Sequence, residues 1–358
     1  KFITPLTFET LTGNPAPTDI WTLRSDNSIA HTEYGRDMDA AIIAPATADF
    51  LGRLAGGLAD QLLLTTLMAS RMPVLLCPSM NVQMLGNPLV QRNLELLQGL
   101  DRYTIMEPEA GWLACRVEGA GRLPDPERIV AWAAKLCEPK TLTGKHLVIT
   151  AGPTREWLDP VRFLSNPSTG KMGYALAQAA WERGARVTLI TGPTTEPRPE
   201  GAAIISVDTT QDLLEAVQRS VEGADALIMA VAPADYSPTE RYEHKVKKED
   251  GPRTLALTRT PDVLATVADQ IKDVLLVGFS AETRDYTINA VQKATKKKLD
   301  LIFVNDVGPE AKGTGFGTET NAGTLLDRAG TVIDEIPLLS KPGVAHRILS
   351  HLVGRMKS

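Results

Sequence analysis

Cysteine, aromatic residues and positive charge are all scarce in this sequence. Its three cysteines form no Cys-x-x-Cys pair, which excludes a disulfide framework and a cysteine zinc site and fits a reducing compartment. Lys and Arg number 38 against 43 Asp and Glu, and a net charge of −5 argues against nucleic acid or an anionic membrane as a partner. No apolar run reaches the roughly 18 residues of a membrane span. We therefore expect a cytoplasmic protein.

Metal-ligand and dinucleotide signatures are also missing. None of the five histidines has metal-ligand spacing, since even His346 and His351 lie five residues apart. No Gly-x-Gly-x-x-Gly sequence follows a predicted strand, which argues against a nicotinamide-dependent dehydrogenase. The composition itself is ordinary: 43% hydrophobic and 23% charged residues in a chain of 358, enough for about two globular domains.

The chain divides into two blocks of alternating strand and helix patterns. A short polar stretch, CEPKTLTG, separates them, and we expect domains at residues 1–138 and 145–358 joined by a linker at 139–144. In the first block, strands are predicted at 40–47, 73–78 and 103–106, with helices at 49–68 and 126–137. Because the first residue is Lys rather than Met, we expect the natural N-terminus to be missing.

The second block is the more regular of the two. Buried strands are predicted at 146–152, 186–192, 224–232, 273–280 and 299–306, with helices between them, then a hairpin and a closing helix. This alternation predicts βαβ units and a mostly parallel sheet, hence an α/β fold. In such sheets ligands bind at the carboxyl ends of the strands. The segments ITAGPT, VAPADY, VGFSAET and VNDV should therefore share one crevice.

Three segments are candidates for phosphate binding. NPSTGKMG (166–173) lacks the Walker frame, and is either an anion site at a helix start or a plain N-cap by Ser168 or Thr169. In KATKKK (293–298), Lys293 and Lys297 are four residues apart and share one face of a helix. KVKK (245–248) is the other basic cluster. These lysines either neutralise a triphosphate in an otherwise acidic protein or form a solvated face.

Together these motifs resemble the bifunctional coenzyme A biosynthesis proteins, in which a phosphopantothenoylcysteine decarboxylase is fused to a phosphopantothenate–cysteine ligase. ITAGPTREWLDPVRFLSNPSTGKMG, ADY, KVKK, VGFSAET and LIFVND stand in the order and spacing of the ligase half. APATADFLGRLAGGLADQLL, PSMNVQM and LACRVEGAGRL match the flavoprotein half. The resemblance covers the whole chain. It implies two three-layer α/β domains: an N-terminally truncated, Rossmann-like flavoprotein domain and a Rossmann-like ligase domain with a mostly parallel sheet.

For the ligase half, the resemblance implies that 4′-phosphopantothenate attacks the α-phosphate of CTP while Mg²⁺ bridges the phosphates. Cysteine then displaces the nucleotide from the acyl-cytidylate. Lys245 matches a phosphate ligand that favours the first step, and Asn166 matches a side chain that orients the acyl intermediate for the second. The positions that match nucleotide and phosphate contacts are Asp235, Lys245, Pro261, Asp262, Val263, Leu264, Phe279, Lys293 and Lys297. Val231 stands where the family usually has a smaller residue.

For the flavoprotein half, the resemblance implies that FMN oxidises the substrate thiol, that carbon dioxide leaves, and that the product is then reduced. His31 matches the family's catalytic histidine, Asn81 its amide for the substrate carboxylate, and Cys115 the proton donor of the reductive step. The residues that would lie against the flavin are Ala44, Pro45, Ala46 and Thr47. The family's first strand and its SGG-type phosphate loop have no counterpart in this sequence, and a chain without them should bind FMN poorly.

Two functions are compatible with this resemblance. The first is a bifunctional enzyme; the alternative is ligase-only activity, with the front domain as an oligomerisation scaffold. Both imply a homo-oligomer, because the family's ligase halves form dimers and its flavoprotein halves form trimers, which together make a dodecamer. A non-catalytic regulatory subunit is a third class, but such relatives carry long acidic tails, and this chain ends in the basic sequence GRMKS.

Overall fold

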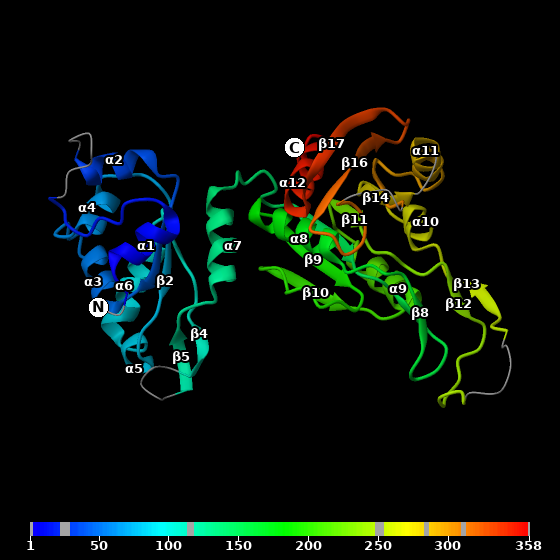
Figure 1. Cartoon of the computed structure of the whole chain (residues 1–358), viewed down its shortest axis with the longest axis horizontal. Coiled ribbons are helices and arrows are strands. Elements are labelled where there is room, and N and C mark those ends of the chain that lie inside the picture. Colours follow the sequence, from blue (N-terminus) through cyan, green and yellow to red (C-terminus); the bar gives the residue numbers. More distant parts are fainter. Residues whose placement is uncertain are drawn as a thin grey trace. The chain divides into compact units, whose positions relative to one another are not determined.

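The computed structural model describes residues 3–21, 29–112, 118–247, 254–282, 286–308 and 313–356. The chain forms two compact units, Lys1–Glu138 and Pro139–Ser358, which we call the front unit and the back unit. Figure 1 colours the front unit from blue to cyan and the back unit from green to red.

The front unit is built on a small parallel sheet. Its strands are β1 (Ala41–Ala46), β2 (Val74–Pro78) and β3 (Tyr103–Ile105), in that order. Its helices are α1 (Pro5–Thr12), α2 (Ala30–Asp37), α3 (Ala48–Ala55), α4 (Leu62–Met68), α5 (Val82–Leu85), α6 (Pro88–Gln98) and α7 (Pro126–Cys137). Leu51, Leu64 and Leu97, from α3, α4 and α6, pack on one face of the sheet, whereas Ile129 of α7 packs on the other. The unit is therefore a three-layer α/β sandwich.

Two details of the front unit differ from the sequence prediction. The single helix expected at 49–68 is two helices, since the Gly56-Gly57 pair ends α3 and Gly57 takes a positive φ of 70°. The segment between the strand predicted at 103–106 and the helix predicted at 126–137 contributes two antiparallel strands, β4 (Glu109–Trp112) and β5 (Glu118–Arg122). Gly-rich strands have little of the hydrophobic alternation that predicts a strand, so the sequence did not reveal these two strands.

The back unit contains an eight-stranded sheet. Its strands are β6 (His146–Ala151), β9 (Arg186–Thr191), β10 (Ala202–Ser206), β11 (Ala226–Met229), β14 (Leu275–Glu282), β15 (Leu301–Asp306), β16 (Thr320–Asp327) and β17 (Val332–Ser340). Their order is β10-β9-β6-β11-β14-β15-β16-β17, and all are parallel except β16 and β17. The predicted mostly parallel sheet is confirmed. In chain order the first six strands run 3-2-1-4-5-6, the doubly wound order whose ligand site lies where the order reverses.

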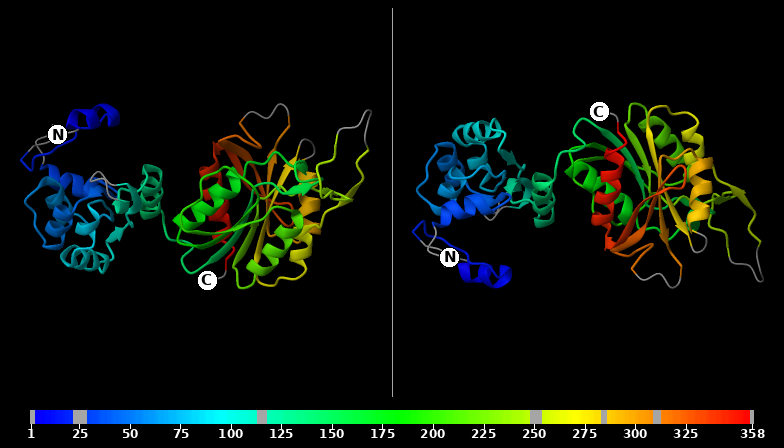
Figure 2. Two further views of the ribbon diagram at one scale, coloured as in Figure 1. Left: turned by 90° about the horizontal axis from the view of Figure 1, so that it is seen from below. Right: turned by 90° about the horizontal axis from the view of Figure 1, so that it is seen from above.

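Helices cover both faces of this sheet, as Figure 2 shows. They are α8 (Lys171–Glu182) and α12 (Lys341–Val353) on one face, and α9 (Thr210–Ser220), α10 (Val263–Ala268) and α11 (Tyr286–Lys296) on the other. Val148 of β6 shares a core with Leu213 of α9 and Val267 of α10. On the opposite face α8 lies so close to β6 that a Cβ at Gly173 would stand 2.5 Å from the Ala151 Cβ. Position 173 therefore has room for the hydrogen atom of a glycine but not for a larger side chain.

Two small ribbons project from the sheet's carboxyl edge. They are β7 (Arg155–Trp157) with β8 (Phe163–Ser165), and β12 (Tyr236–Pro238) with β13 (Leu257–Arg259), both antiparallel. Figures 1 and 2 show the second ribbon extending away from the sheet. Within the described ranges, no helix has the length and the hydrophobicity that crossing a membrane requires.

Candidate functional site

A cavity of about 440 Å³ opens at the carboxyl edge of the back-unit sheet, beside the point where the strand order reverses. Its volume lies within the roughly 300–1,000 Å³ of small-molecule sites. Segments far apart in sequence line it: the chain after β11, the end of β13, the start of α10, β14 and α11. Eight sequence-predicted residues are among the lining: Asp235, Pro261, Asp262, Val263, Leu264, Phe279, Lys293 and Lys297.

Lys293 is the more buried of the two predicted lysines in this cavity. Its Nζ donates to the Phe279 carbonyl oxygen at 2.7 Å and lies 3.4 Å from Ser280 Oγ. Burial lowers the pKa of this ammonium group, and the nearby charge of Lys297 lowers it further. An anionic ligand beside Nζ would relieve both penalties, so the position suits a phosphate.

Lys297 follows the last residue of α11, and its N–H donates to the Lys293 carbonyl at 3.0 Å, so it stands one helical turn beyond Lys293 and also lines the cavity. Its Nζ donates to Asp262 Oδ1 at 2.9 Å. Burial alone would raise the pKa of the Asp262 carboxyl, but the hydrogen bonds from Lys297 and the Ala265 N–H hold it below its usual value. Asp262 also caps α10 through that second bond, so one carboxylate orients both a helix start and a lysine.

The opposite wall is formed by the segment after β11. Thr260 ties this segment to the start of α10, since its Oγ1 donates to the Ala234 carbonyl at 2.6 Å and its N–H to the Asp235 carbonyl at 3.1 Å. The Asp235 side chain is exposed at the rim. Phe279 completes the wall and stacks obliquely on Phe303, with ring centroids 5.4 Å apart. The cavity therefore combines cations, a rim carboxylate and apolar surface.

Two predicted catalytic residues, Asn166 and Lys245, are not among the lining residues of the cavity. Asn166 is half-buried, and its Nδ2 donates to the carbonyl oxygens of Pro233, at 2.8 Å, and Ala232, at 3.3 Å. Pro233 lines the cavity, so the amide is fixed directly behind it. Lys245 lies on the segment between β12 and β13, with its side chain exposed. Sequence reasoning missed Arg259, a third cation in the lining, although it stands just before the Thr-Pro-Asp motif.

Fewer segments line the cavity than the crevice predicted from the sequence would include. ITAGPT lies beside the cavity, since the Ala232 N–H donates to the Gly152 carbonyl at 2.9 Å, but neither ITAGPT nor VNDV contributes a lining residue. The N-cap predicted at Ser168 or Thr169 was wrong. Gly170 caps α8, with a φ of 85° and no capping side chain.

Lys341 holds the Gly-rich segment GTGFG (313–317) and the residue after it. Its buried Nζ donates to the carbonyls of Gly315, at 3.3 Å, and Thr318, at 2.5 Å.

In the front unit, the carboxyl ends of β1 and β2 bring two predicted groups together. Ala46 pairs with Pro78, and the Ser79 N–H donates to the Ala46 carbonyl at 3.2 Å. Three of the predicted flavin-contact residues, Ala44, Pro45 and Thr47, are exposed at this edge. Asn81 follows β2 and caps α5, accepting from the Gln83 N–H at 2.8 Å. Small uncharged side chains beside an amide form a surface that suits an apolar ring system.

His31 stands on a separate element, near the start of α2, which packs against α4. Its Nδ1 is buried and has no hydrogen-bond partner in the described structure, a feature shared with His146 at the amino end of β6. A buried imidazole nitrogen without a partner is costly, and a bound ligand is one means of satisfying it. Cys115 lies outside the described residues. Burial raises the pKa of the Cys77 thiol to about 11, so that thiol is inert at neutral pH.

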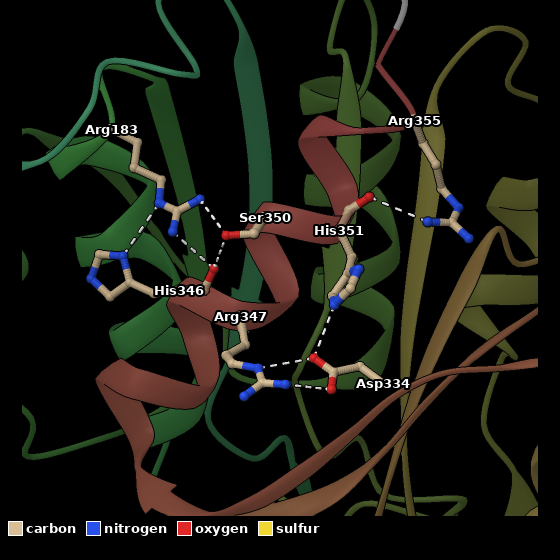
Figure 3. Close-up of polar contacts among 7 residues, drawn as sticks. All are labelled: Arg183, Asp334, His346, Arg347, Ser350, His351 and Arg355. Atoms are coloured by element: carbon tan, nitrogen blue, oxygen red, sulfur yellow. Dashed lines mark hydrogen bonds and ion pairs between the residues drawn. The ribbon is translucent and has the colours of Figure 1, made fainter.

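A second polar cluster lies on α12, away from the cavity, and Figure 3 shows its contacts. The Asp334 carboxylate of β17 accepts from Arg347 and lies 2.9 Å from His351 Nε2. Arg183, after α8, donates to His346 Nδ1 at 3.3 Å and to Ser350 Oγ at 3.0 Å. These contacts fasten α12 to β17 and to the end of α8, so we assign the cluster a structural role. Over the described ranges, no three His, Cys, Asp or Glu side chains are grouped as a metal site.

The doubly wound sheet, with a cationic cavity beside the point where its strand order reverses, is typical of ligand-binding α/β enzyme domains. Comparison with known proteins agrees. Residues 142–356 match the model of the DNA/pantothenate metabolism flavoprotein C-terminal domain, and residues 1–138 match the Flavoprotein model.

The full-length relatives identify the family. The coenzyme A biosynthesis bifunctional protein CoaBC of Bacillus subtilis is 45% identical over 361 residues, covering 100% of this chain and 88% of the relative. CoaBC of Vibrio vulnificus strain YJ016 is 40% identical over 357 residues, covering 98% and 87%. A crystal structure of a CoaBC C-terminal domain superimposes with a TM-score of 0.51 at 39% identity, over 60% of this chain and 97% of that one. The chain belongs to the CoaBC family of bifunctional coenzyme A biosynthesis proteins.

Proposed function

We propose that this chain performs two consecutive steps of coenzyme A biosynthesis. The back unit ligates cysteine to 4′-phosphopantothenate at the expense of CTP, and the front unit decarboxylates the resulting 4′-phosphopantothenoylcysteine with FMN. The observation that carries the ligase assignment is the convergence of eight predicted nucleotide contacts on one cavity at the reversal point of the sheet. The family membership supports the pairing of the two activities.

In the first ligase step, the substrate carboxylate attacks the α-phosphate of CTP and pyrophosphate leaves. The chemistry needs positioning and neutralisation of negative charge rather than a covalent catalyst. Lys293 and Lys297 lie in the cavity, where they would bind phosphate oxygens. Lys245, on the exposed segment, would approach the same phosphates from outside. Asp235 and Phe279 would contact the ribose and the base.

In the second ligase step, the amine of cysteine attacks the acyl carbon and CMP leaves. Asn166 is assigned to this step because its amide is held behind Pro233 by two hydrogen bonds and therefore keeps a fixed orientation. An oriented amide places the acyl group for attack without taking part in proton transfer.

Mg²⁺ is proposed as an ion carried by the nucleotide. Mg²⁺ in phosphoryl-transfer sites is held largely by substrate phosphates, with one or two carboxylates. An ion held in this way does not require a grouped set of protein ligands.

In the front unit, FMN would supply two-electron oxidation and reduction when bound. The exposed residues Ala44, Pro45 and Thr47 at the end of β1 fit the flavin ring, and the unpartnered Nδ1 of His31 fits a ligand-facing role. His31 would accept a proton from the substrate. Asn81 would hold the substrate carboxylate until carbon dioxide leaves, and Cys115 would return a proton. The homo-oligomer remains a prediction of the family resemblance.

The test separates the two ligase steps. With 4′-phosphopantothenate, cysteine, Mg²⁺ and CTP, wild type should release pyrophosphate and form the cysteine amide. Asn166→Ala should still release pyrophosphate but form the amide at least about tenfold more slowly. We choose Ala because the carboxylate of an Asp would face the carbonyls of Ala232 and Pro233. If both signals fell together, Asn166 would belong to the first step. Replacing CTP with ATP in the same assay measures nucleotide preference.

The alternative function, ligase-only activity, gives a different result in the same mixture with FMN added. The reaction of the wild-type chain would then stop at the cysteine adduct, and mass spectrometry would detect no product that has lost carbon dioxide.

A further inference from the structure

The carboxylate of Asp159 is the centre of a contact network that no predicted role explains. It lies in the turn of the β7–β8 hairpin, and its side chain is 0% exposed. Its Oδ1 accepts from the backbone N–H groups of Val161, at 2.8 Å, and Arg162, at 2.9 Å. Its Oδ2 accepts from Arg162 Nε at 2.9 Å and Nη2 at 2.5 Å. A buried carboxylate with this many donors is a fixed anchor rather than a titrating group.

The anchor reaches across to the segment that carries Lys245. Oδ2 of Asp159 also accepts from the Val246 N–H at 3.1 Å, and Arg162 Nη2 donates to the Val246 carbonyl at 2.7 Å. The Asp159–Arg162 pair thus engages both polar groups of one residue, as a neighbouring β-strand would. A third bond, from the Tyr242 N–H to the Leu158 carbonyl at 2.8 Å, fixes the same segment three residues before Lys245.

These bonds bracket Lys245. Its own side chain is exposed, so packing does not hold it in place. An exposed lysine loses side-chain and backbone entropy when it orders on a phosphate, and a backbone fixed in advance reduces that cost. We propose that Asp159 is a positioning residue for the ligase reaction, which holds the backbone at Val246 so that Lys245 reaches the nucleotide phosphates.

The hydrogen bonds of Arg162 are part of this arrangement. Arg162 is 47% exposed and would rotate freely without a partner. Asp159 fixes its guanidinium through two bonds, which directs Nη2 to the Val246 carbonyl. The hydrogen bond from Arg162 to the Val246 carbonyl therefore depends on Asp159.

The test is a double-mutant cycle on pyrophosphate release, and it rests on the proposed role of Lys245. Asp159→Asn should slow pyrophosphate release about tenfold to a hundredfold. In a Lys245→Ala background the same change should have less than about a twofold effect, because the residue to be positioned is gone. An equal effect of Asp159→Asn in both backgrounds would overturn the proposal. A wild-type rate for Lys245→Ala alone would instead overturn the role assigned to Lys245.

Two further variants guard against a merely structural effect. Val246→Pro removes the N–H that Asp159 accepts from Val246, and because proline also fixes the local φ and restricts the backbone of Lys245, it should reduce pyrophosphate release at least as much as Asp159→Asn. Asp327→Asn is the matched control: Asp327 also accepts backbone N–H groups in a hairpin turn, at 2.9 Å from Ala329 and 2.8 Å from Thr331, but it lies away from the cavity. It should leave pyrophosphate release unchanged, and a loss equal to that of Asp159→Asn would contradict a specific role.

Discussion

The two units share one architecture but differ in the chemistry of their strand ends. In the back unit, the carboxyl edge of the sheet gathers lysines, an arginine and two aspartates around one cavity. In the front unit, the same edge presents small uncharged residues and the amide of Asn81, while the candidate base, His31, stands on another helix. The charged edge suits the transfer of phosphorylated groups, and the neutral edge suits a flavin and a carboxylate about to leave. One fold supports both because the function depends on the residues at the edge.

The largest expected effect separates the two units. Exchanging His31 for Asn should reduce decarboxylation by a factor of about 10² to 10⁴, the usual contribution of a positioned base. Ligation should be unchanged, because the cavity lies wholly in the back unit. Mass spectrometry of the reaction mixture measures both effects, since the variant should accumulate 4′-phosphopantothenoylcysteine. Loss of ligation in the same variant would contradict the division of labour.

The next effect tests the charged edge. Lys293→Ala removes the more buried cation of the cavity, and pyrophosphate release at low CTP should fall about 10²-fold. Lys298→Gln is the control, since Lys298 lies in the same KATKKK cluster but pairs with Asp269, at 2.8 Å, outside the cavity. Steady-state rates over a range of CTP concentrations measure both variants. Equal rates for the two would remove the phosphate assignment from Lys293.

A smaller effect concerns the packing that positions the back-unit edge. Gly173→Ala places a methyl group 2.5 Å from the Ala151 Cβ and 2.8 Å from the Thr150 carbonyl, so α8 must move off β6. Overpacking of this kind costs about 1–3 kcal/mol of unfolding free energy. Gly52→Ala is the control, since Gly52 also lies in a helix and its added Cβ would stand in ordinary contact, 3.6 Å from Asn93 Nδ2. Urea unfolding monitored by circular dichroism compares them, and equal losses would show that packing against β6 is not the cause.

The smallest effect is a pH dependence in the polar cluster on α12. Hydrogen bonds from Arg347 and His351 hold the pKa of the Asp334 carboxyl below its usual value despite its burial. A carboxyl with a lowered folded-state pKa stabilises the fold above its unfolded pKa of about 3.9, and this stabilisation is lost as the pH falls through the lower value. Asp334→Asn should therefore cost about 1 kcal/mol at pH 7 and less below pH 4. Thermal unfolding at both pH values checks this, and a pH-independent difference would contradict it.

The sequence predicted most of the back unit because its signals are local. Short apolar runs that end in Gly or Asp predicted the parallel strands, and the four-residue spacing of Lys293 and Lys297 placed both on the face of α11 that lines the cavity. The ribbons β7–β8 and β12–β13 were not predicted, because strands of three residues leave no periodicity to detect. The anchoring role of Asp159 was also hidden, since its partner Val246 lies 87 residues away. Such contacts follow from tertiary packing alone.

Product analysis of single turnovers tests whether the back unit performs the ligation and the front unit the decarboxylation. Wild type and the Asn166→Ala and His31→Asn variants would each be mixed with 4′-phosphopantothenate, cysteine, Mg²⁺, CTP and FMN, and the products weighed by mass spectrometry. We expect three different outcomes: 4′-phosphopantetheine from wild type, pyrophosphate with little amide from Asn166→Ala, and undecarboxylated cysteine adduct from His31→Asn. If the two variants accumulated the same species, the assignment of separate chemistry to the two units would be wrong.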